Sequence, residues 1–410
     1  MNPRHGEVPI LRPSDAFELF AHTRLANTFF APFVFPSPPK ADGEELIDSV
    51  VYFSDCLLLV EAKAKEKEPF YESQDRELHW AKGKLDKALR QLKGAYRQLS
   101  KQMTTRLTSR LRGAVLLPPV PALHCYGLIL LGHQALPYQP HLLLPGLTQA
   151  EFPVHVFSAR DFAQLLSMLT TPMDLVVYLD TRASVPGGVN TPVHGERAFF
   201  QFYADNYEKL IFRRSSRRTC DMKFLKPQGD LLREGMGENY KYGAVIDDIL
   251  EHFCAALGAG GGLAAGPGLW ADPDAIVAVM EQIGLYSRLH RIHLGKRLYS
   301  LLAAVTRTGM PGYFCTFSRS IRRVTVFCGT QEPSPTRGRN LVICTDIALA
   351  HWQPYGAQTG LGIATEPLQG VGRSYDACRR TPSWPEEVRQ ELAKEFPVVF
   401  GGGQVDLVDT

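Results

Sequence analysis

Two β-rich runs joined by a very short turn constrain the fold of this chain more than any other feature. The runs span residues 46–53 and 56–63, and only Ser54 and Asp55 stand between them. Strand-forming runs separated by two turn-forming residues are typical of a β-hairpin. The second run is apolar on both faces over most of its length, which indicates a central strand covered on both sides.

The two-residue turn also determines which residues of the hairpin lie opposite each other. It pairs Asp48 with Glu61 and Leu46 with Lys63. Because side chains alternate between the faces of a sheet, Asp48, Glu61 and Lys63 project from one face. Two carboxylates facing each other inside a domain need a cation, and Mg²⁺ binds one or two carboxylates together with water and phosphate oxygen. The sequence therefore predicts a site for Mg²⁺ or Mn²⁺ at the end of this strand.

This arrangement resembles the catalytic motif of the PD-(D/E)xK restriction-endonuclease-like nuclease superfamily. Asp48 matches the Asp that begins the hairpin, and Glu61-Ala62-Lys63 match the (D/E)xK, although no proline precedes Asp48. The resemblance spans roughly residues 10–185. It implies that Asp48 and Glu61 bind the metal and that the carbonyl of Ala62 also faces it. Lys63 would then serve the attacking water and the transition state.

Two further site residues enter through this resemblance. Glu18, on a helix expected over residues 14–30, matches the metal-binding carboxylate that the superfamily places before the hairpin. It could also be a capping-box partner of Asp15. Gln91 with Tyr96 resembles a catalytic Gln and nearby Tyr on the helix after the hairpin, spaced one residue wider than is common. An exposed glutamine is the alternative interpretation.

A strongly basic segment follows the hairpin. Residues 80–112 hold ten Lys or Arg side chains and a single acid, Asp86. Such a surplus suits a phosphate backbone, whereas a solvated helix face is the alternative. Leucines recurring on one face predict a helix from about residue 80 to 99. The candidate nucleic-acid contacts on it are Lys82, Lys84, Lys87, Arg90, Lys93, Arg97 and Lys101.

The remaining pattern predicts two domains. Residues 1–187 are expected to form an α/β, restriction-endonuclease-like core, with a mixed central sheet flanked by helices. A proline-rich connection around residues 32–39 is expected to lack regular structure. The other elements expected in this core are strands near 125–131 and 154–157 and helices at 161–169 and 173–182.

A boundary segment at residues 186–192 is expected to lead into an α+β C-terminal domain, residues 193–410. This domain begins with a short basic stretch (Arg213, Arg214, Arg217, Arg218). A flexible Gly-rich insertion is expected near residues 258–268. The expected elements are helices at 242–257, 273–283 and 286–305 and strands at 313–317, 322–328 and 340–345. No motif in this domain indicates a particular reaction, so its expected role is substrate selection, dimerisation or regulation.

Composition narrows the class of protein. A chain of 410 residues with 45% hydrophobic side chains suits a globular protein of two domains, and a net charge of +3 does not by itself imply a nucleic-acid partner. Eight cysteines without a C-x-x-C pair favour free thiols in a reducing compartment over a zinc site. Neither a signal-peptide pattern nor a membrane-spanning run is present, which predicts a cytoplasmic protein with no membrane partner.

The sequence thus favours a Mg²⁺- or Mn²⁺-dependent phosphodiesterase that acts on nucleic acid, with DNA favoured over RNA and endonuclease over exonuclease activity. The resemblance implies a setting in bacterial defence against phage, restriction or repair, and cleavage of two strands would suit a homodimer. One alternative is a non-catalytic nucleic-acid- or partner-binding protein that keeps the nuclease fold. Another is an assembly protein whose C-terminal domain is the active part.

Overall fold

The chain forms two compact units. Apart from residues 171–173, the described residues up to Leu210 belong to the first unit, and those from Tyr240 onward belong to the second. The computed structural model describes residues 12–40, 43–65, 74–102, 104–109, 111–132, 150–184, 196–207, 210, 240–258, 273–318, 322–367, 374–381, 384–400 and 406–407.

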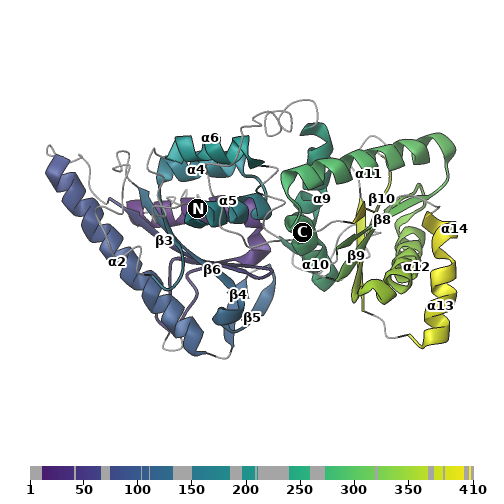
Figure 1. Ribbon diagram of the computed structural model, residues 1–410, viewed down its shortest axis with the longest axis horizontal. Helices are drawn as coiled ribbons and strands as arrows, with labels where there is room; N and C mark the ends of the chain where they lie inside the picture. The colour runs from purple at the N-terminus through teal and green to yellow at the C-terminus, as the bar shows by residue number, and fades with distance from the viewer. Residues whose placement is uncertain are drawn as a thin grey trace, which may run out of the picture. The chain divides into compact units, whose positions relative to one another are not determined.

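A five-stranded mixed sheet is the centre of the first unit, in the order β1-β2-β3-β6-β7 (Figure 1). The first three strands pair antiparallel, and β3, β6 and β7 pair parallel. The central strand β3 is buried over its first seven residues, as a strand covered on both faces must be. The strands are β1 (Val34–Pro36), β2 (Ser49–Phe53), β3 (Cys56–Ala64), β6 (His124–Gly132) and β7 (Val154–Ser158).

Helix α2 (Gln74–Lys101) covers one face of this sheet. Its apolar stripe, which includes Leu85, Leu92 and Leu99, packs on Leu57 and Leu59 of β3. A small hairpin of β4 (Thr105–Ser109) and β5 (Gly113–Leu117) extends the same layer, because Leu107, Val115 and Leu117 join the same core. Figure 1 shows α2 and this hairpin below the sheet. The β4–β5 hairpin is not among the elements expected from the sequence.

The opposite face is covered by the other helices of the unit. Phe29 of α1 (Pro13–Phe29) packs edge-on against Phe53 of β2, and Phe162 of α4 (Ala159–Met168) packs against Phe157 of β7. Helix α5 (Pro172–Ser184) and helix α6 (Glu196–Asp205) lie on the same side in Figure 1. The first unit is therefore a sheet between two layers of helices.

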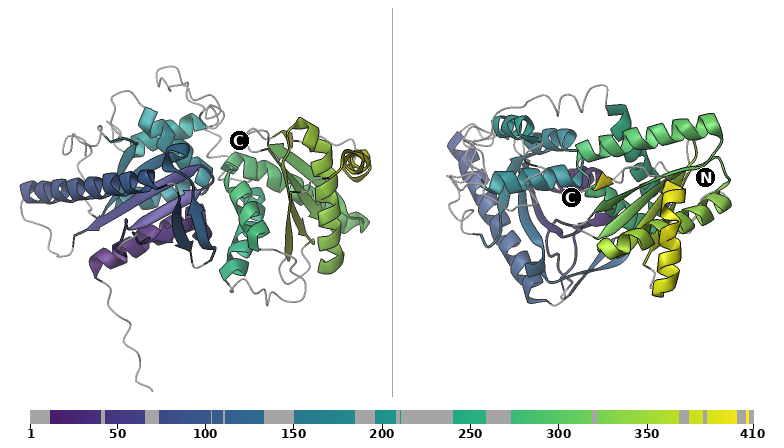
Figure 2. Two further views of the ribbon diagram at one scale, coloured as in Figure 1. Left: turned by 90° about the horizontal axis from the view of Figure 1, so that it is seen from below. Right: turned by 45° about the vertical axis from the view of Figure 1, so that its right-hand side comes forward.

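The second unit is built on a separate five-stranded sheet, in the order β11-β10-β9-β8-β12. Figure 2 shows this sheet between helices on its two faces. The strands are β8 (Gly312–Ser318), β9 (Arg323–Gly329), β10 (Thr359–Thr365), β11 (Tyr375–Arg380) and β12 (Asp406–Leu407). The helices are α9 (Tyr240–Gly258), α10 (Pro273–Gly284), α11 (Arg288–Thr308), α12 (Ser334–Trp352), α13 (Glu386–Lys394) and α14 (Phe396–Phe400).

Helices α9 and α11 cross with almost no space between their backbones. A Cβ atom added at Gly295 of α11 would lie 1.8 Å from the carbonyl oxygen of Tyr242 in α9. Only glycine permits so close an approach of two helices. On the other face, α12 packs Leu341 and Cys344 against Val324 and Val326 of β9.

Most expected elements are confirmed to within a few residues, with α2 beginning at Gln74 instead of near residue 80. One expected strand, residues 340–345, is wrong, because these residues lie within α12. Leu341 and Cys344, three apart, are buried, whereas Ile343 between them is 46% exposed. That spacing is helical, and a short apolar run does not distinguish helix from strand by itself.

The proline-rich connection is also more regular than expected. Residues Ala31–Phe33 form a 3-10 turn, and β1 follows at the edge of the sheet, where β2 is its partner among the described strands. Pro36 ends this strand, where the missing N–H of proline is tolerated. The expected boundary segment at 186–192, the basic stretch from Arg213 to Arg218 and residues 259–268 of the Gly-rich insertion lie outside the described residues.

Candidate active site

The hairpin register brings the motif residues together. Strands β2 and β3 pair from Phe53 with Cys56 to Ser49 with Val60, as the two-residue turn predicts. Ser54 in the turn has a positive φ of 55°. One residue beyond the paired ladder, the Asp48 carboxylate Oδ2 accepts a hydrogen bond of 2.7 Å from the backbone N–H of Ala62. Asp48 therefore lies beside Glu61 and Lys63 at the end of β3.

Lys63 connects the two carboxylates. Its Nζ atom lies 3.1 Å from Asp48 Oδ2 and forms an ion pair with Glu61 Oε2. The side chain of Glu61 is 0% exposed, and those of Asp48 and Lys63 are 9% and 11% exposed. The three groups thus form one buried cluster, on the face of the sheet that α2 covers.

Glu61 is the most perturbed member of this cluster. Burial, followed by the neighbouring Asp48 charge, raises the pKa of Glu61 to about 8, although Lys63 opposes the change. Its Oε1 atom is buried and has no hydrogen-bond partner among the described residues. Burial acts to lower the pKa of Lys63, but Glu61 and Asp48 outweigh it, and the net direction is upward. Without a further cation, the folded cluster therefore favours the protonated form of Glu61.

Glu18 lies close enough to interact electrostatically with this cluster. It is half-buried on α1, and its pKa is raised first by burial and then by the charges of Asp48 and Glu45. No hydrogen bond joins Glu18 to the other site residues among the described contacts. Glu18 is thus an electrostatic neighbour of the acid pair.

Gln91 lies on the helix that covers the correct face of the sheet. Its side-chain Oε1 atom is buried and lacks a hydrogen-bond partner among the described residues. The adjacent Leu92 packs near Gly127, which pairs with Leu59 of β3. The ring of Tyr96 packs on Phe152, 4.6 Å between centroids, and so belongs to the core. No contact in the described part of the chain joins Gln91 to the acid pair.

Glu45 is a neighbour that the sequence did not reveal. Its charge acts to raise the pKa of both Glu18 and Glu61, and the residue itself is exposed. It sits in an irregular segment and forms only an isolated bridge to Pro39. The alternation of side chains that placed Asp48 does not extend to such a segment, so spacing alone could not place Glu45 near the site.

The oxygen atoms of the cluster suit a small divalent cation. Within the described residues no three His, Cys, Asp or Glu side chains are grouped to hold a metal. Mg²⁺, however, is commonly bound through one or two carboxylates plus water. The backbone N–H and C=O of a strand residue point towards the same neighbouring strand. Because the N–H of Ala62 donates to Asp48, the carbonyl of Ala62 also lies on the Asp48 side of β3. Asp48, Glu61 and this carbonyl form a hard-oxygen set with an unpartnered oxygen on Glu61.

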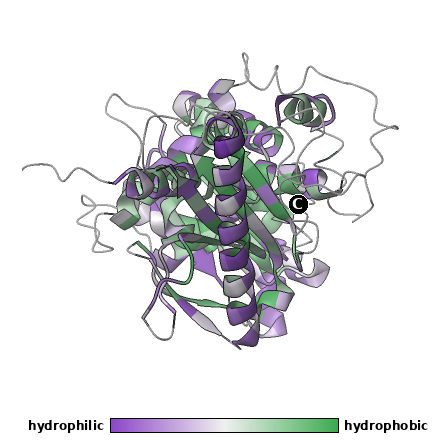
Figure 3. Cartoon of the chain, turned by 90° about the vertical axis from the view of Figure 1, so that its left-hand side faces the viewer, coloured by the Kyte–Doolittle hydropathy of each residue, from purple (hydrophilic) through white to green (hydrophobic). Residues whose placement is uncertain are grey.

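The basic residues of α2 lie mainly on its solvent side. Figure 3 views the molecule from the side of α2, and most of the visible ribbon of this helix is coloured as hydrophilic. Arg90 forms an ion pair with Asp86 at 3.2 Å, and Arg97 forms one with Glu151 at 3.3 Å. Lys84 and Lys93 are half-buried. The exposed members are Lys82, Lys87, Arg90, Arg97 and Lys101.

Comparison with known proteins adds no assignment. No family model, curated protein or solved structure matches the chain. No helix in the described part of the chain is long and apolar enough to cross a membrane. The chemistry of the cluster therefore carries the functional argument.

Proposed function

We propose that the first unit is a metal-dependent nuclease that hydrolyses phosphodiester bonds of nucleic acid. The observation that carries the proposal is the burial of Asp48, Glu61 and Lys63 at the end of β3, where one oxygen of Glu61 has no hydrogen-bond partner among the described residues. Two carboxylates and one amine in a buried cluster are costly for stability unless a further cation or a substrate uses them. A restriction-endonuclease-like core is the fold that this interpretation favours.

Mg²⁺ or Mn²⁺ is the cofactor that the donor atoms suit. Asp48, Glu61 and the Ala62 carbonyl would hold it, and Glu18 would assist from α1. When bound, such an ion activates water and neutralises charge on a phosphoryl group. Asp48 is already oriented for this role, because the Ala62 N–H and Lys63 both contact its Oδ2 atom.

Lys63 would act as an electrostatic partner of the reacting phosphate. Both carboxylates favour its protonated form, which is consistent with the upward direction of its pKa. A protonated amine fixed beside the reacting group stabilises the negative charge that builds in the transition state. Lys63 would therefore orient the water and stabilise charge more readily than it would accept a proton.

Nucleic acid, with DNA favoured, is the substrate that the charge distribution supports. The exposed cations of α2 lie on the helix that covers the face carrying the acid pair. Clustered Lys and Arg side chains bind phosphate backbones in a salt-dependent manner. The second unit would then contribute substrate selection, dimerisation or regulation.

The test is cleavage of supercoiled plasmid and of single-stranded DNA with Mg²⁺ or Mn²⁺. We expect Asp48→Ala and Lys63→Met to lower the rate on the order of 100-fold or more, and EDTA to stop the reaction. Asp55→Ala, in the exposed turn of the same hairpin, is the matched control and should retain activity. If wild type and all variants behave alike, the assignment of the site is wrong. DNA binding without cleavage would favour a binding protein that keeps this fold.

A further inference from the structure

The first turns of α2 border an open hollow on the protein surface. Its volume is about 620 Å³, and the described side chains that line it are Asp75, Arg76, His79 and Trp80. This volume falls within the roughly 300–1,000 Å³ typical of sites for small ligands. The four residues occupy positions i, i+1, i+4 and i+5, so they form one continuous patch of the helix surface.

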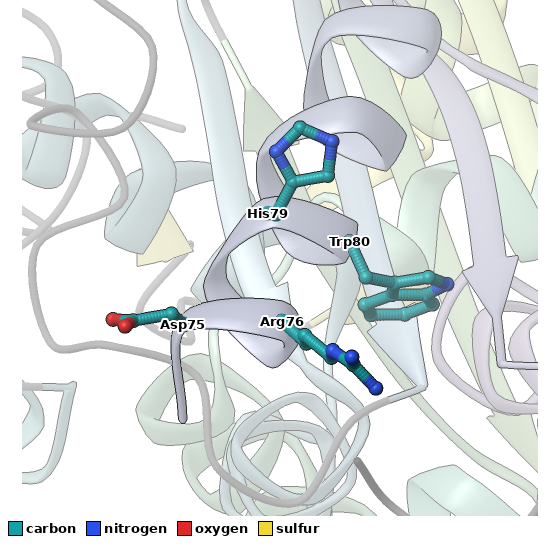
Figure 4. A pocket seen from close by; sticks show the side chains of 4 residues that line it. All are labelled: Asp75, Arg76, His79 and Trp80. Carbon is teal, nitrogen blue, oxygen red and sulfur yellow. The ribbon is translucent and has the colours of Figure 1, made fainter. Parts of the chain in front are cut away.

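Figure 4 shows how these side chains divide. Arg76 and Trp80 point to one side of the helix, and Asp75 and His79 point away from them. An indole ring and a guanidinium plane provide flat surfaces on which a nucleobase stacks. A carboxylate and an imidazole provide hydrogen-bonding groups for the edge of a base. The hollow therefore has a side suited to base stacking, at Arg76 and Trp80, and a separate polar side at Asp75 and His79.

The hollow lies at the start of the cationic side of α2. Four side chains lie along one line of this helix, because successive members are eleven, seven and four residues apart. They are His79, Arg90, Arg97 and Lys101. Ala81 and Leu85, on the other side, are buried against the sheet. A strand whose phosphates follow this line would place one of its bases at the hollow.

The hollow is also near the end of the catalytic strand. Lys65, two residues after Lys63, forms an ion pair of 2.5 Å with Glu77 in the same turn of α2. The first turn of α2 is thereby fixed beside the end of β3. A base held here would belong to a nucleotide close to the one that is cut.

We propose that this hollow is a subsite for an unstacked nucleobase, and that the enzyme prefers single-stranded or locally unpaired nucleic acid. This inference rests on the proposed nuclease function, because it assigns the substrate class of the same site. Bases in a duplex are stacked and paired, so only an unpaired or extruded base can enter a hollow of this kind. Aromatic stacking accepts any base, and the subsite is expected to select strand form over sequence.

The test measures binding in EDTA, so it does not depend on cleavage. The full chain is titrated against a fluorescein-labelled oligothymidine strand and an abasic strand of equal length, which has the same phosphates and no bases. Trp80→Ala should weaken oligothymidine binding on the order of ten-fold and leave abasic binding unchanged. Trp80→Phe keeps a ring and should retain most of the affinity. Lys87→Ala, a cation elsewhere on α2, should weaken binding of both strands equally.

Three results would overturn the subsite. These are equal affinity of Trp80→Ala and wild type for oligothymidine, equal loss on the abasic strand, or no binding of either strand by the wild type. The first would show that Trp80 does not hold a base. Failure of the nuclease proposal would appear separately, as absence of metal-dependent plasmid cleavage while the base-dependent effect of Trp80→Ala persists.

Discussion

Replacement of Glu61 by glutamine is expected to change how the stability of the first unit depends on pH. Glu61 is fully buried, and its pKa of about 8 compares with 4.5 for the free side chain. Below pH 4.5 the group is protonated in both the folded and the unfolded chain and costs nothing. Between these values the unfolded chain releases the proton and the folded chain keeps it, so stability falls as pH rises.

The magnitude follows from the two pKa values. At about 1.4 kcal/mol per pH unit, the difference between 4.5 and about 8 corresponds to a loss of about 5 kcal/mol, complete above pH 8. Glu61→Gln removes this loss because glutamine does not ionise. Metal-free Glu61→Gln is therefore expected to be more stable than wild type at pH 8 and nearly equal to it at pH 4.5.

Hydrogen exchange of amides in β3 is the suitable measurement, because it reports on the first unit separately from the second. In EDTA, protection in the wild type should fall from pH 5 to 8 relative to Glu61→Gln, after correction for intrinsic exchange. Mg²⁺ should restore protection in the wild type and have little effect on the variant. A parallel pH dependence in the two proteins, or a variant that is less stable at pH 8, would refute the reasoning.

Other substitutions test the fold and the charged surface. Gly295→Ala should lower the free energy of unfolding by about 3 kcal/mol or more, because its new methyl group would collide with the Tyr242 carbonyl. Gly94→Ala adds a methyl group where no atom lies within 4 Å, and it should raise the free energy of unfolding by up to about 1 kcal/mol. Chemical denaturation of each variant distinguishes these outcomes, and equal effects would contradict the close crossing. Ser54→Gly should raise the melting temperature, because glycine relieves the positive φ of the turn; a lower value would contradict this. Removing Arg90 and Lys101 together should lower the salt slope of DNA binding by about two, and an unchanged slope would place the DNA elsewhere.

The hairpin and its cluster could be predicted because their geometry depends on a few neighbouring residues. A two-residue turn leaves one register for the β2–β3 ladder, and side-chain alternation then places Asp48, Glu61 and Lys63 on one face. The burial of Glu61 was less accessible to prediction. It depends on β6 and α2, whose arrangement around the hairpin is set by contacts distant in sequence.

Features that depend on irregular backbone or on ambiguous apolar runs escaped prediction. Glu45 acts on the cluster electrostatically from a segment without regular alternation. The hollow at α2 begins before the residues that showed helical periodicity. The apolar run at residues 341–344 is short enough to fit a strand or a helix. In the structure it is helical, and Leu341 and Cys344 are buried on one side of α12. Local pattern is informative where its period is unbroken over several residues.

The two-residue turn between β2 and β3 also affects the order in which the site forms during folding. A hairpin closed by two residues forms within microseconds, so Asp48 and Glu61 meet as soon as this segment is free to fold. Strand β6, which buries β3 from the other side, is separated from it by the whole of α2 and the β4–β5 hairpin. Long loops close slowly, and during synthesis this strand is made later. The growing chain therefore carries its acid pair first as an ordinary solvated hairpin, and the pKa of Glu61 rises only when the rest of the sheet and α2 bury the side chain.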